Sequence, residues 1–519
     1  MELIKKRIHY IREGKKIFDQ FYVDEDYNVP EAKEDVGSIV DTGTELKIEE
    51  IRPVENYVRI TGKLYFRILY LNVSSDPKPG VLEGKLPFEE MVYAENQEGE
   101  EFYVQNVRIE FTPSLIHSRK LSLRAMVELE VGREKLVDEE TVTDAEGDVP
   151  LYKKMKKVQL LQLEVTKKDT YRIKEEITIP GTKESIGQIL FTDISERKLE
   201  LRPGQDELIV RGELFLFSMY LSGDEKPDWI SQTIPYEGRI PCEGISEEMY
   251  FSIRHTMEDT LTDLRMDEDG EMRILGIEGT LALHMNFYRE ESVELLEDLY
   301  SLQKQCLFDT TEVVCEELLM QNQSKCKVTE RLSLPELKTD VLQILHARGA
   351  IQVEHADRTG EGIRVEGILH LSFLYLRGDD AEPYGSWQGM IPFEHQIECK
   401  EMPEETVYNM EQHIEQLQIT LVGSESVEIK GILTFDTFLR RPVKVWTMEN
   451  VREEPLDLEQ LEKRPSIVGH IVQRGEDLWQ LAKQYMTTKE GIMEVNGMQN
   501  ENVKEGDKLL IFKENMSIL

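Results

Sequence analysis

Three stretches of the chain repeat one alternation of apolar and polar side chains. They are VRITGKLYFRILYL from Val58, IVRGELFLFSMYL from Ile209 and VEGILHLSFLYL from Val365. In the first stretch the apolar positions of one parity are Val58, Ile60, Leu64, Phe66, Ile68 and Tyr70. A period of two places such side chains on one face of a strand. Each stretch is therefore predicted to be a long β-strand with one buried face.

The spacing of other residues shows that these strands belong to a larger repeated unit. Gly62, Gly212 and Gly367, one in each stretch, lie 150 and 155 residues apart. A proline precedes each glycine by 32 residues, a tyrosine follows it by eight, and a Pro-aromatic pair follows it by 23 to 25: Pro87-Phe88, Pro235-Tyr236 and Pro392-Phe393. A second alternating stretch lies 63 to 67 residues after each glycine, around Ala125, Gly279 and Gly431. Recurrence in one order at one period indicates a tandem repeat.

The glycines inside these strands need a physical reason, because glycine weakens a strand. A β-bulge, or an aromatic ring lying against the bare backbone, is the usual one. Turn sequences such as LSGDEKP and RGDDAEP separate the strands. The predicted fold is mainly β, with three tandem β-sandwich-like repeat domains. Since the period is too long for a solenoid, the repeats are expected to be separate beads.

The predicted organisation divides the chain into eight parts. They are an N-terminal segment (1–28), β-domain 1 (29–135), a linker (136–170), β-domain 2 (171–290), a linker (291–328), β-domain 3 (329–445), a linker (446–467) and a final small domain (468–513). The pattern in 291–328 is compatible with a helix or with an extra strand.

The last fifty residues follow a different pattern, predicted to be β-α-α-β. An alternating strand at His470–Gln473 leads to Asp477, a suitable N-cap for a helix carrying Leu478, Trp479, Leu481, Ala482 and Tyr485. Thr487 and Glu490 have capping-box spacing for a second helix, and Gly497 suits its C-terminus. The segment EGDKLLIF supplies the closing strand. Trp479 is expected to be a core residue rather than a sugar-stacking platform.

This segment resembles a LysM domain in the pattern V-x-x-G-E-D-L-W-x-L-A followed by E-G-D-K-L-L-I. The resemblance implies a groove that binds N-acetylglucosamine-containing glycan. Its sides would be formed by Gly475, Glu476, Asp477 and Leu478, and by Met498, Asn500, Glu501 and Val503. Two positions depart from the family pattern: G-D-T is Gly475-Glu476-Asp477 here, and N-P is Asn500-Glu501. The two adjacent acids would favour a basic protein surface over a neutral sugar.

Three such β-repeats followed by a LysM segment resemble the SipL-type spore morphogenetic proteins, whose repeats are called SPOCS domains. The resemblance implies a scaffold in the mother-cell cytosol at the forespore surface. It also implies binding to the morphogenetic ATPase that forms the basement layer of the spore coat, with LysM as the docking module. A peptidoglycan-binding wall or cortex protein is the alternative.

Composition and charge restrict the function further. The 101 Asp and Glu residues against 62 Lys and Arg give a net charge of −39, which argues against nucleic-acid binding. The densest basic run, KKMKK at 153–157, is expected to be a solvated loop. The chain lacks a secretory signal and an apolar run long enough to span a membrane, so we expect a cytoplasmic protein.

The chemistry-bearing residues predict neither an enzyme nor a metal site. The five cysteines have no CxxC spacing and are expected to be free thiols. No HExxH, GxSxG or P-loop motif is present in the sequence, and no cofactor is expected. His284, His370 and His413 lie in alternating strands and are expected to be structural residues.

Overall fold

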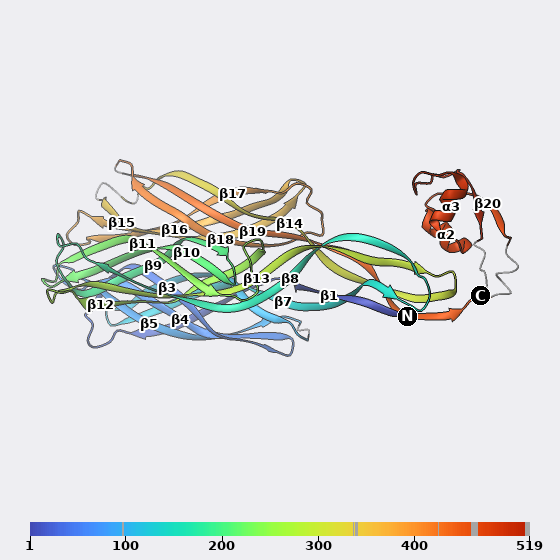
Figure 1. The fold of residues 1–519 in the computed structure, drawn as a ribbon. Coiled ribbons are helices and arrows are strands. Elements are labelled where there is room, and N and C mark those ends of the chain that lie inside the picture. Colours follow the sequence, from blue (N-terminus) through green and yellow to red (C-terminus); the bar gives the residue numbers. More distant parts are fainter. Residues whose placement is uncertain (96–97, 336, 338–340, 424, 458–464, 514–519) are drawn as a thin grey trace.

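The computed structural model of the chain describes residues 1–95, 98–335, 337, 341–423, 425–457 and 465–513. The molecule is elongated (Figure 1). A broad head of β-strands narrows into a twisted bundle of strands, and a small domain containing helices lies beside the far end of that bundle. The mainly β fold predicted from the alternation, with its C-terminal β-α-α-β unit, is confirmed.

Each repeat contains two antiparallel sheets. The strands of the first repeat are β1 (Glu2–Glu13), β2 (Ile17–Asn28), β3 (Val36–Val54), β4 (Tyr57–Asn72), β5 (Pro79–Tyr93), β6 (Glu101–His117) and β7 (Lys120–Glu146). Those of the second repeat are β8 (Tyr152–Thr178), β9 (Ile186–Pro203), β10 (Glu207–Ser222), β11 (Pro227–Pro241), β12 (Tyr250–Met266) and β13 (Met272–Tyr300). Those of the third repeat are β14 (Lys304–Ser333), β15 (Val341–Thr359), β16 (Gly362–Arg377), β17 (Tyr384–Glu398), β18 (Val407–Leu421) and β19 (Ser426–Pro455).

The two alternating stretches of each repeat are the central strands of its two sheets. β4, β10 and β16 lie between the strands β3 and β5, β9 and β11, and β15 and β17. β7, β13 and β19 are the central strands of the opposite sheets. In the first repeat, for example, Leu64 and Phe66 of β4 pack with Leu121 and Leu123 of β7 in one buried cluster. The apolar residues that recur with a period of two therefore form the facing surfaces of two packed sheets.

The repeated glycines each make room for an aromatic ring on the neighbouring strand. A Cβ atom on Gly62 would lie 2.8 Å from the ring of Phe88, and one on Gly367 would lie 2.7 Å from the ring of Phe393. On Gly212 it would lie 2.3 Å from the ring of Tyr236. These rings belong to the Pro-aromatic pairs of the repeat. Of the two reasons left open by the sequence, a ring against the bare backbone is found at these three glycines, whereas no ring among the described residues lies against Gly279 or Gly431.

Strands run through the ranges that the sequence assigned to the N-terminal segment and to the linkers. β1 and β2 occupy residues 1–28 and pair with β7, as β8 pairs with β13 and β14 with β19. The range 291–328, where helix and strand were both open, is the end of β13 and most of β14. β19 continues to Pro455, while 458–464 of the third predicted linker lie outside the described residues.

The three repeats are not separate beads, so that expectation is wrong. Residues of all three form one buried apolar cluster, the axial core: Val40, Leu69, Leu71, Leu190, Phe191, Phe217, Met219, Leu345, Leu374 and Tyr384. Val40, Leu190 and Leu345 are the extra residues of three equivalent β-bulges, in β3, β9 and β15. A bulge redirects a side chain out of the strand alternation. Each repeat thus places one bulge residue in a core that it shares with the other two.

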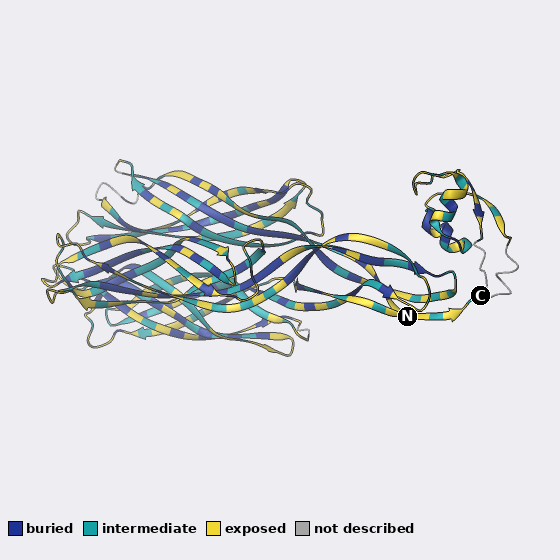
Figure 2. Ribbon diagram, in the orientation of Figure 1, coloured by how far each residue is buried: buried dark blue, intermediate teal, exposed yellow. Residues whose placement is uncertain are grey.

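The far halves of the longest strands form the stalk, which comprises three antiparallel two-stranded ribbons. They join residues 2–13 to 134–146, 152–163 to 288–300, and 304–318 to 440–455. One repeat supplies each ribbon, and a common apolar cluster contains Ile8, Val137, Leu160, Leu295 and Val445. Buried positions accordingly continue along the narrow part of the molecule (Figure 2). The ribbons are held together by burial of their inner faces.

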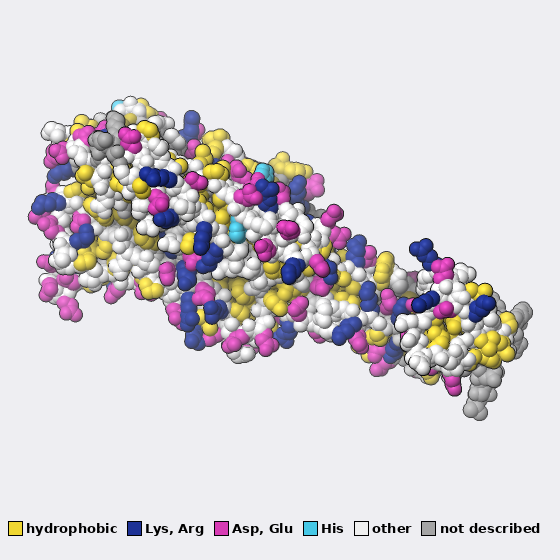
Figure 3. Space-filling model, turned by 90° about the horizontal axis from the view of Figure 1, so that it is seen from above, with side chains coloured by type: hydrophobic (Ala, Val, Ile, Leu, Met, Phe, Trp, Pro, Cys, Tyr) yellow, Lys and Arg dark blue, Asp and Glu magenta, His cyan; other side chains and the backbone are white. Residues whose placement is uncertain are grey.

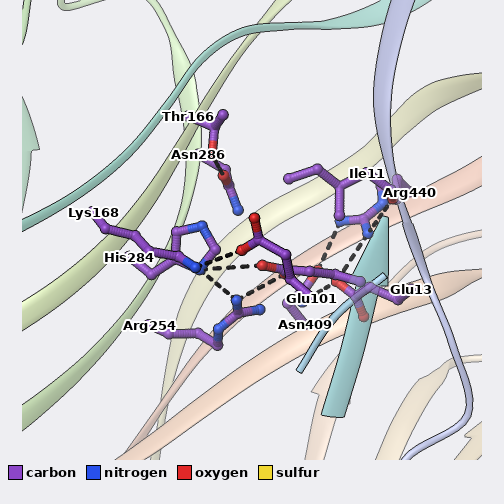
Figure 4. Close-up of polar contacts among 11 residues, drawn as sticks. Ile11, Glu13, Glu101, Thr166, Lys168, Arg254, His284, Asn286, Asn409 and Arg440 are labelled. Atoms are coloured by element: carbon purple, nitrogen blue, oxygen red, sulfur yellow. Dashed lines mark hydrogen bonds and ion pairs between the residues drawn. The ribbon is translucent and has the colours of Figure 1, made fainter. Parts of the chain in front are cut away.

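A layer of buried polar groups joins the repeats where the stalk meets the head (Figure 4). The Arg440 side chain is 1% exposed; its guanidinium donates to Glu316 at 2.8 Å and to Glu13 at 3.0 Å. The opposing effect of burial is outweighed by Glu316, Tyr288 and Glu13, which raise the pKa of Arg440. Glu13 belongs to the first repeat and Arg440 to the third, so this ion pair crosses a repeat boundary. Arg254 of the second repeat likewise donates to Glu134 of the first at 2.8 Å.

The outer surface carries acidic and basic side chains interspersed with apolar ones (Figure 3). The basic run 153–157 is not a loop: it lies within β8, in the stalk. Lys153 pairs with Asp144 at 2.6 Å, and Lys154 lies 3.4 Å from Glu297. A charged run can form a strand at this place because the lysine side chains reach solvent while Val158 and Leu160 pack into the stalk core.

Candidate binding site at the tip of the stalk

The C-terminal unit has the predicted order of elements. Strand β20 (Ile467–Ile471) pairs antiparallel with β21 (Lys508–Phe512), and helices α2 (Leu478–Tyr485) and α3 (Lys489–Asn496) lie between them in sequence. Its core contains Val472, Leu481, Ile492, Leu509 and Ile511. Leu509 and Ile511 are alternate positions of β21, and Leu481 and Ile492 lie on the buried faces of the two helices.

The helix ends follow the sequence signals with one exception. The Asp477 side chain accepts from the backbone N–H of Gln480, and the Gln480 side chain accepts from the backbone N–H of Asp477, which makes a capping box. Gly497 ends α3 in the left-handed conformation with φ of 63°, as predicted. The predicted Thr487–Glu490 capping box is wrong, because the N-cap of α3 is Thr488, which accepts from Gly491. Thr487 is buried instead, and its carbonyl accepts a hydrogen bond from the stalk.

Trp479 contacts the stalk through its ring and its indole nitrogen. It is 6% exposed, and its ring meets Tyr300 of β13 edge-on, with centroids 4.9 Å apart. Its Nε1 donates to Asp298 at 2.7 Å, and Asp298 also accepts from Lys483 at 2.5 Å. The Tyr300 hydroxyl donates to the Thr487 carbonyl at 2.9 Å. Trp479 is therefore buried as predicted, but its burial depends on a neighbouring part of the chain.

The two acids of the predicted groove already have partners within the molecule. Asp477 caps α2, and its carboxylate also lies 3.2 Å from Lys154 Nζ of the stalk. Burial lowers the pKa of Lys154, but Asp477 and Glu297 outweigh it and raise that pKa. Glu476 accepts from the backbone N–H of Gln473 at 2.8 Å and lies 2.7 Å from Nε2 of His470, and these two bonds lower its pKa.

The structure brings the two predicted sides of the groove together at their base. Leu478 is buried, and Met498 and Val503 pack against the same apolar cluster. Asn500 and Glu501 are exposed on the loop before β21, and Gly475 is exposed with φ of 89°. Glu501 accepts from Lys489 at 2.6 Å. The polar groups that a ligand could reach thus lie mainly on the 498–503 loop rather than at Glu476 and Asp477.

Sequence reasoning missed the contact between this unit and the stalk. Asp298 and Tyr300 lie at the end of β13, 179 or more residues before Trp479 in the chain. One feature of the sequence pointed to an interface. An alternating strand ends in LEDLY at 296–300, and its aromatic and acidic side chains are suited to contacts with another domain. The partner of that interface could not be read from spacing alone.

The histidines singled out from the sequence differ in their surroundings. Nδ1 of His284 lies 2.5 Å from Arg254 and 3.3 Å from Glu134, while His370 bonds Gln352 at 2.7 Å. His413 has a buried Nδ1 without a hydrogen-bond partner. In the described part of the chain, no group of three or more His, Cys, Asp or Glu side chains is arranged to hold a metal ion. The five cysteines there are free thiols.

Two families match the chain. The SipL, SPOCS domain family matches residues 35–112, 185–265 and 340–422, and the LysM domain family matches residues 470–512. No curated protein and no solved structure matches it. Across the described residues, the helices are too short or too polar to cross a membrane. SPOCS and LysM domains are binding modules; the first implies a role in spore morphogenesis and the second implies peptidoglycan binding. The chain therefore contains three SipL/SPOCS domains followed by a C-terminal LysM domain.

Proposed function

We propose that the protein is a non-enzymatic scaffold of the spore envelope, which acts in the mother-cell cytosol at the forespore surface. It tethers the morphogenetic ATPase of the coat basement layer, and the LysM domain is its docking module. The SPOCS and LysM matches support the general role, and the placement of the LysM domain supports the specific one.

The observation that carries the proposal is the position of the LysM domain at one end of a long molecule (Figure 3). The stalk holds the domain through Trp479, Lys483 and Asp477. These residues lie on or beside α2, whereas the exposed 498–503 loop lies elsewhere on the domain. A loop presented in this way can meet a large partner without interference from the head.

The head gives the scaffold a second surface, far from the LysM domain. Two binding surfaces on one molecule raise the effective concentration of one partner near the other. The strands β5, β11 and β17 each lie at the margin of their own sheet, and a marginal strand can pair with another protein wherever no neighbouring repeat covers its edge. This arrangement favours a tether over a single-ligand binding protein.

The test compares two binding partners with the full-length protein. Cosedimentation with filaments of the purified ATPase should be saturable, and Glu501→Arg should weaken it about tenfold, since the loop would lose an exposed acid. The matched control is Glu494→Arg, on the exposed face of α3, which should change the affinity less than twofold. Unchanged binding by Glu501→Arg would contradict the assignment of this loop as the docking surface.

Peptidoglycan binding is the second candidate, and the LysM match itself favours it. Cosedimentation with purified sacculi tests it, with N-acetylglucosamine oligomers as competitors. Strong binding to sacculi that the oligomers abolish, together with no binding to the ATPase, would replace the scaffold proposal by this one.

A further inference from the structure

The second repeat departs from the other two at one position of strand β9, which pairs with the central strand β10. Opposite Leu64 of β4 the first repeat has Leu46, and opposite Leu369 of β16 the third repeat has Ile351. The corresponding partner of Leu214 in β10 is Glu196. A carboxyl group thus occupies a ladder position that is apolar in both other repeats. Natural sequences break their own pattern in this way chiefly at functional or strained sites.

A β-bulge next to Glu196 has also moved. In the first and third repeats the extra residues are Glu49 and Glu354, on one side of the repeated glycine. In the second repeat the extra residue is Arg197, which lies between the partners of Glu213 and Leu214, on the other side of Gly212. Bulges re-aim side chains and are frequent beside active and binding sites. Two changes specific to one repeat therefore fall on adjacent residues.

Both residues line a cavity of about 420 Å³ between the repeats. Its wall includes Asn106 and Arg108 from the first repeat, Ser195 from the second, and Arg348 and His413 from the third. Apolar side chains complete the wall: Phe18, Val107, Ala350, Ile351, Val353 and Ile414. A cavity of this volume falls in the range of small-molecule sites, which also combine apolar walls with a few polar groups.

Most charged groups of the wall are already paired. Arg348 donates to both carboxylate oxygens of Asp41 at 2.7 Å. Arg108 donates to Glu128 at 2.5 Å, and Asp193 lies 2.9 Å from His346. These groups can build the walls of the cavity but have little capacity left for a ligand.

Four neighbouring groups are not paired in this way. The buried atoms Ser195 Oγ, Glu196 Oε1 and His413 Nδ1 have no hydrogen-bond partner within the described residues. The carboxylate of Asp436 lies 3.6 Å from His413 Nδ1, beyond hydrogen-bond distance. The closest basic group to Glu196 is His255, at 3.6 Å, which is too long for a hydrogen bond. Arg197 lies over the ring of Phe215 at 5.2 Å. Burial lowers the pKa of Arg197 and the charge of Asp193 opposes this effect, but no carboxylate among the described residues lies within ion-pair distance of the guanidinium. Buried polar groups without partners are rare and call for an explanation.

The charge state of these four groups determines which class of ligand they could bind. Burial raises the pKa of Glu196 to about 7, and it lowers the pKa of His413. Near neutral pH the unpaired groups therefore amount to the Arg197 guanidinium, the neutral Ser195 and His413 side chains, and a Glu196 carboxyl group that is about half protonated. A guanidinium matches a carboxylate or a phosphate, but the apolar side chains of the wall suit a carbon skeleton, which inorganic phosphate lacks.

We propose that this cavity is a binding site for a small organic acid, whose carboxylate is held by Arg197 and whose hydroxyl or amide groups bond Ser195, Glu196 and His413. The ligand would contact residues from all three repeats, so its binding would stabilise their assembly. This inference does not depend on the proposed tethering function.

The test is calorimetric titration of the full chain with three organic acids: lactate, gluconate and glutamate. At least one should bind with a Kd below about 1 mM. Arg197→Gln should weaken that binding about tenfold or more, because a charged hydrogen-bond donor is lost. Lys198→Gln is the matched control: it removes a cation from the adjacent exposed position of β9 and should change the Kd less than twofold.

A second variant protects the test against misfolding of Arg197→Gln. Ser195→Ala removes a single hydroxyl from the wall and should weaken binding about threefold or more. Failure of all three acids to bind, or equal binding to wild type and to both variants, would overturn the proposal. Equal binding of inorganic phosphate would overturn the assignment of the ligand as an organic acid.

Discussion

The SPOCS repeats and the LysM domain are joined to the molecule in different ways. The repeats share buried apolar clusters along the axis, together with buried ion pairs such as Glu13–Arg440 and Glu134–Arg254. The LysM domain contacts the stalk through one aromatic pair, Trp479 and Tyr300, and a few polar bonds around Asp298 and Lys154.

This difference indicates two degrees of attachment within one chain. A shared core cannot be opened without exposing apolar surface on every repeat, so the head and stalk should unfold together. The LysM domain buries its own small core around Leu481 and Ile492. Leaving the stalk would break the Trp479–Tyr300 contact and the polar bonds to Asp298 and Lys154, but it would leave the Leu481 and Ile492 core in place.

The largest expected effect comes from opening the axial core. Phe217 is fully buried there, and Phe217→Ala should lower the free energy of unfolding of the body by about 3–5 kcal/mol. Chemical denaturation followed by fluorescence measures this change. Tyr22→Ala, at an exposed position of β2, is the control and should cost no more than about 0.5 kcal/mol. Similar effects of the two substitutions would show that the repeats do not depend on a common core.

The polar layer should give the next largest effect. Glu316→Leu removes one of the two carboxylates that bind Arg440, and leaving that buried cation under-paired should cost about 3 kcal/mol. The double variant Glu316→Leu/Arg440→Met should be less destabilised than the single variant, because it also removes the buried charge. The same denaturation experiment tests both, and a double variant that is the less stable of the two would contradict this account of the layer.

The pH dependence should differ in sign between the body and the LysM domain. The folded-state pKa of Glu196, about 7, lies above its ordinary value of 4.5. The folded body therefore holds a proton that the unfolded chain releases, and its stability should fall as pH rises through this interval, by on the order of 1–3 kcal/mol. Glu196→Gln should flatten this part of the profile in thermal melts between pH 5 and pH 8.

Glu476 provides the opposite case in the LysM domain. The hydrogen bonds that lower the pKa of Glu476 stabilise the folded domain at pH values above the ordinary pKa of a glutamate. That contribution is lost as the pH falls through the lowered pKa. Melts of Glu476→Gln at low pH should show a smaller loss for the LysM domain than wild type does. A wild-type domain that gains stability on acidification would contradict this sign.

The smallest effect on stability is expected at the joint itself. Asp298→Ala removes the acceptor of Trp479 and Lys483, and it should release the LysM domain while the melting temperature of the body changes little. Small-angle X-ray scattering should then show a broader range of distances. Glu294→Ala, at an exposed stalk position, is the control and should leave the scattering unchanged. Identical curves for the two variants would mean that other contacts hold the joint.

The sequence predicted those parts of the fold that depend on local periodicity. Alternation around Gly62, Gly212 and Gly367 located the central strands, and the Pro-aromatic pairs accounted for the glycines themselves. In the LysM domain, Asp477 and Gly497 marked helix ends because capping depends on residues only a few positions away.

The missed features involve residues distant in sequence. Val40, Leu190 and Leu345 interrupt the alternation in three places, and a single strand gives no indication that these side chains meet. Lys153 and Lys154 lie in a strand although a charged run also suits a loop, because the ribbon needs only its inner face to be apolar. The predicted LysM groove residues remain a prediction, while the partners of Glu476 and Asp477 became visible only from the fold.

The three equivalent bulges also fix how many copies the molecule can contain. Val40, Leu190 and Leu345 come from one repeat each and belong to the same apolar cluster on the axis. Removing one copy would expose to solvent the apolar surface that the remaining two copies bury against it. A fourth copy would find no unoccupied position around the axis. Duplication or loss of a single unit should therefore be far less tolerated here than in an open-ended solenoid, which can gain or lose a unit at its ends.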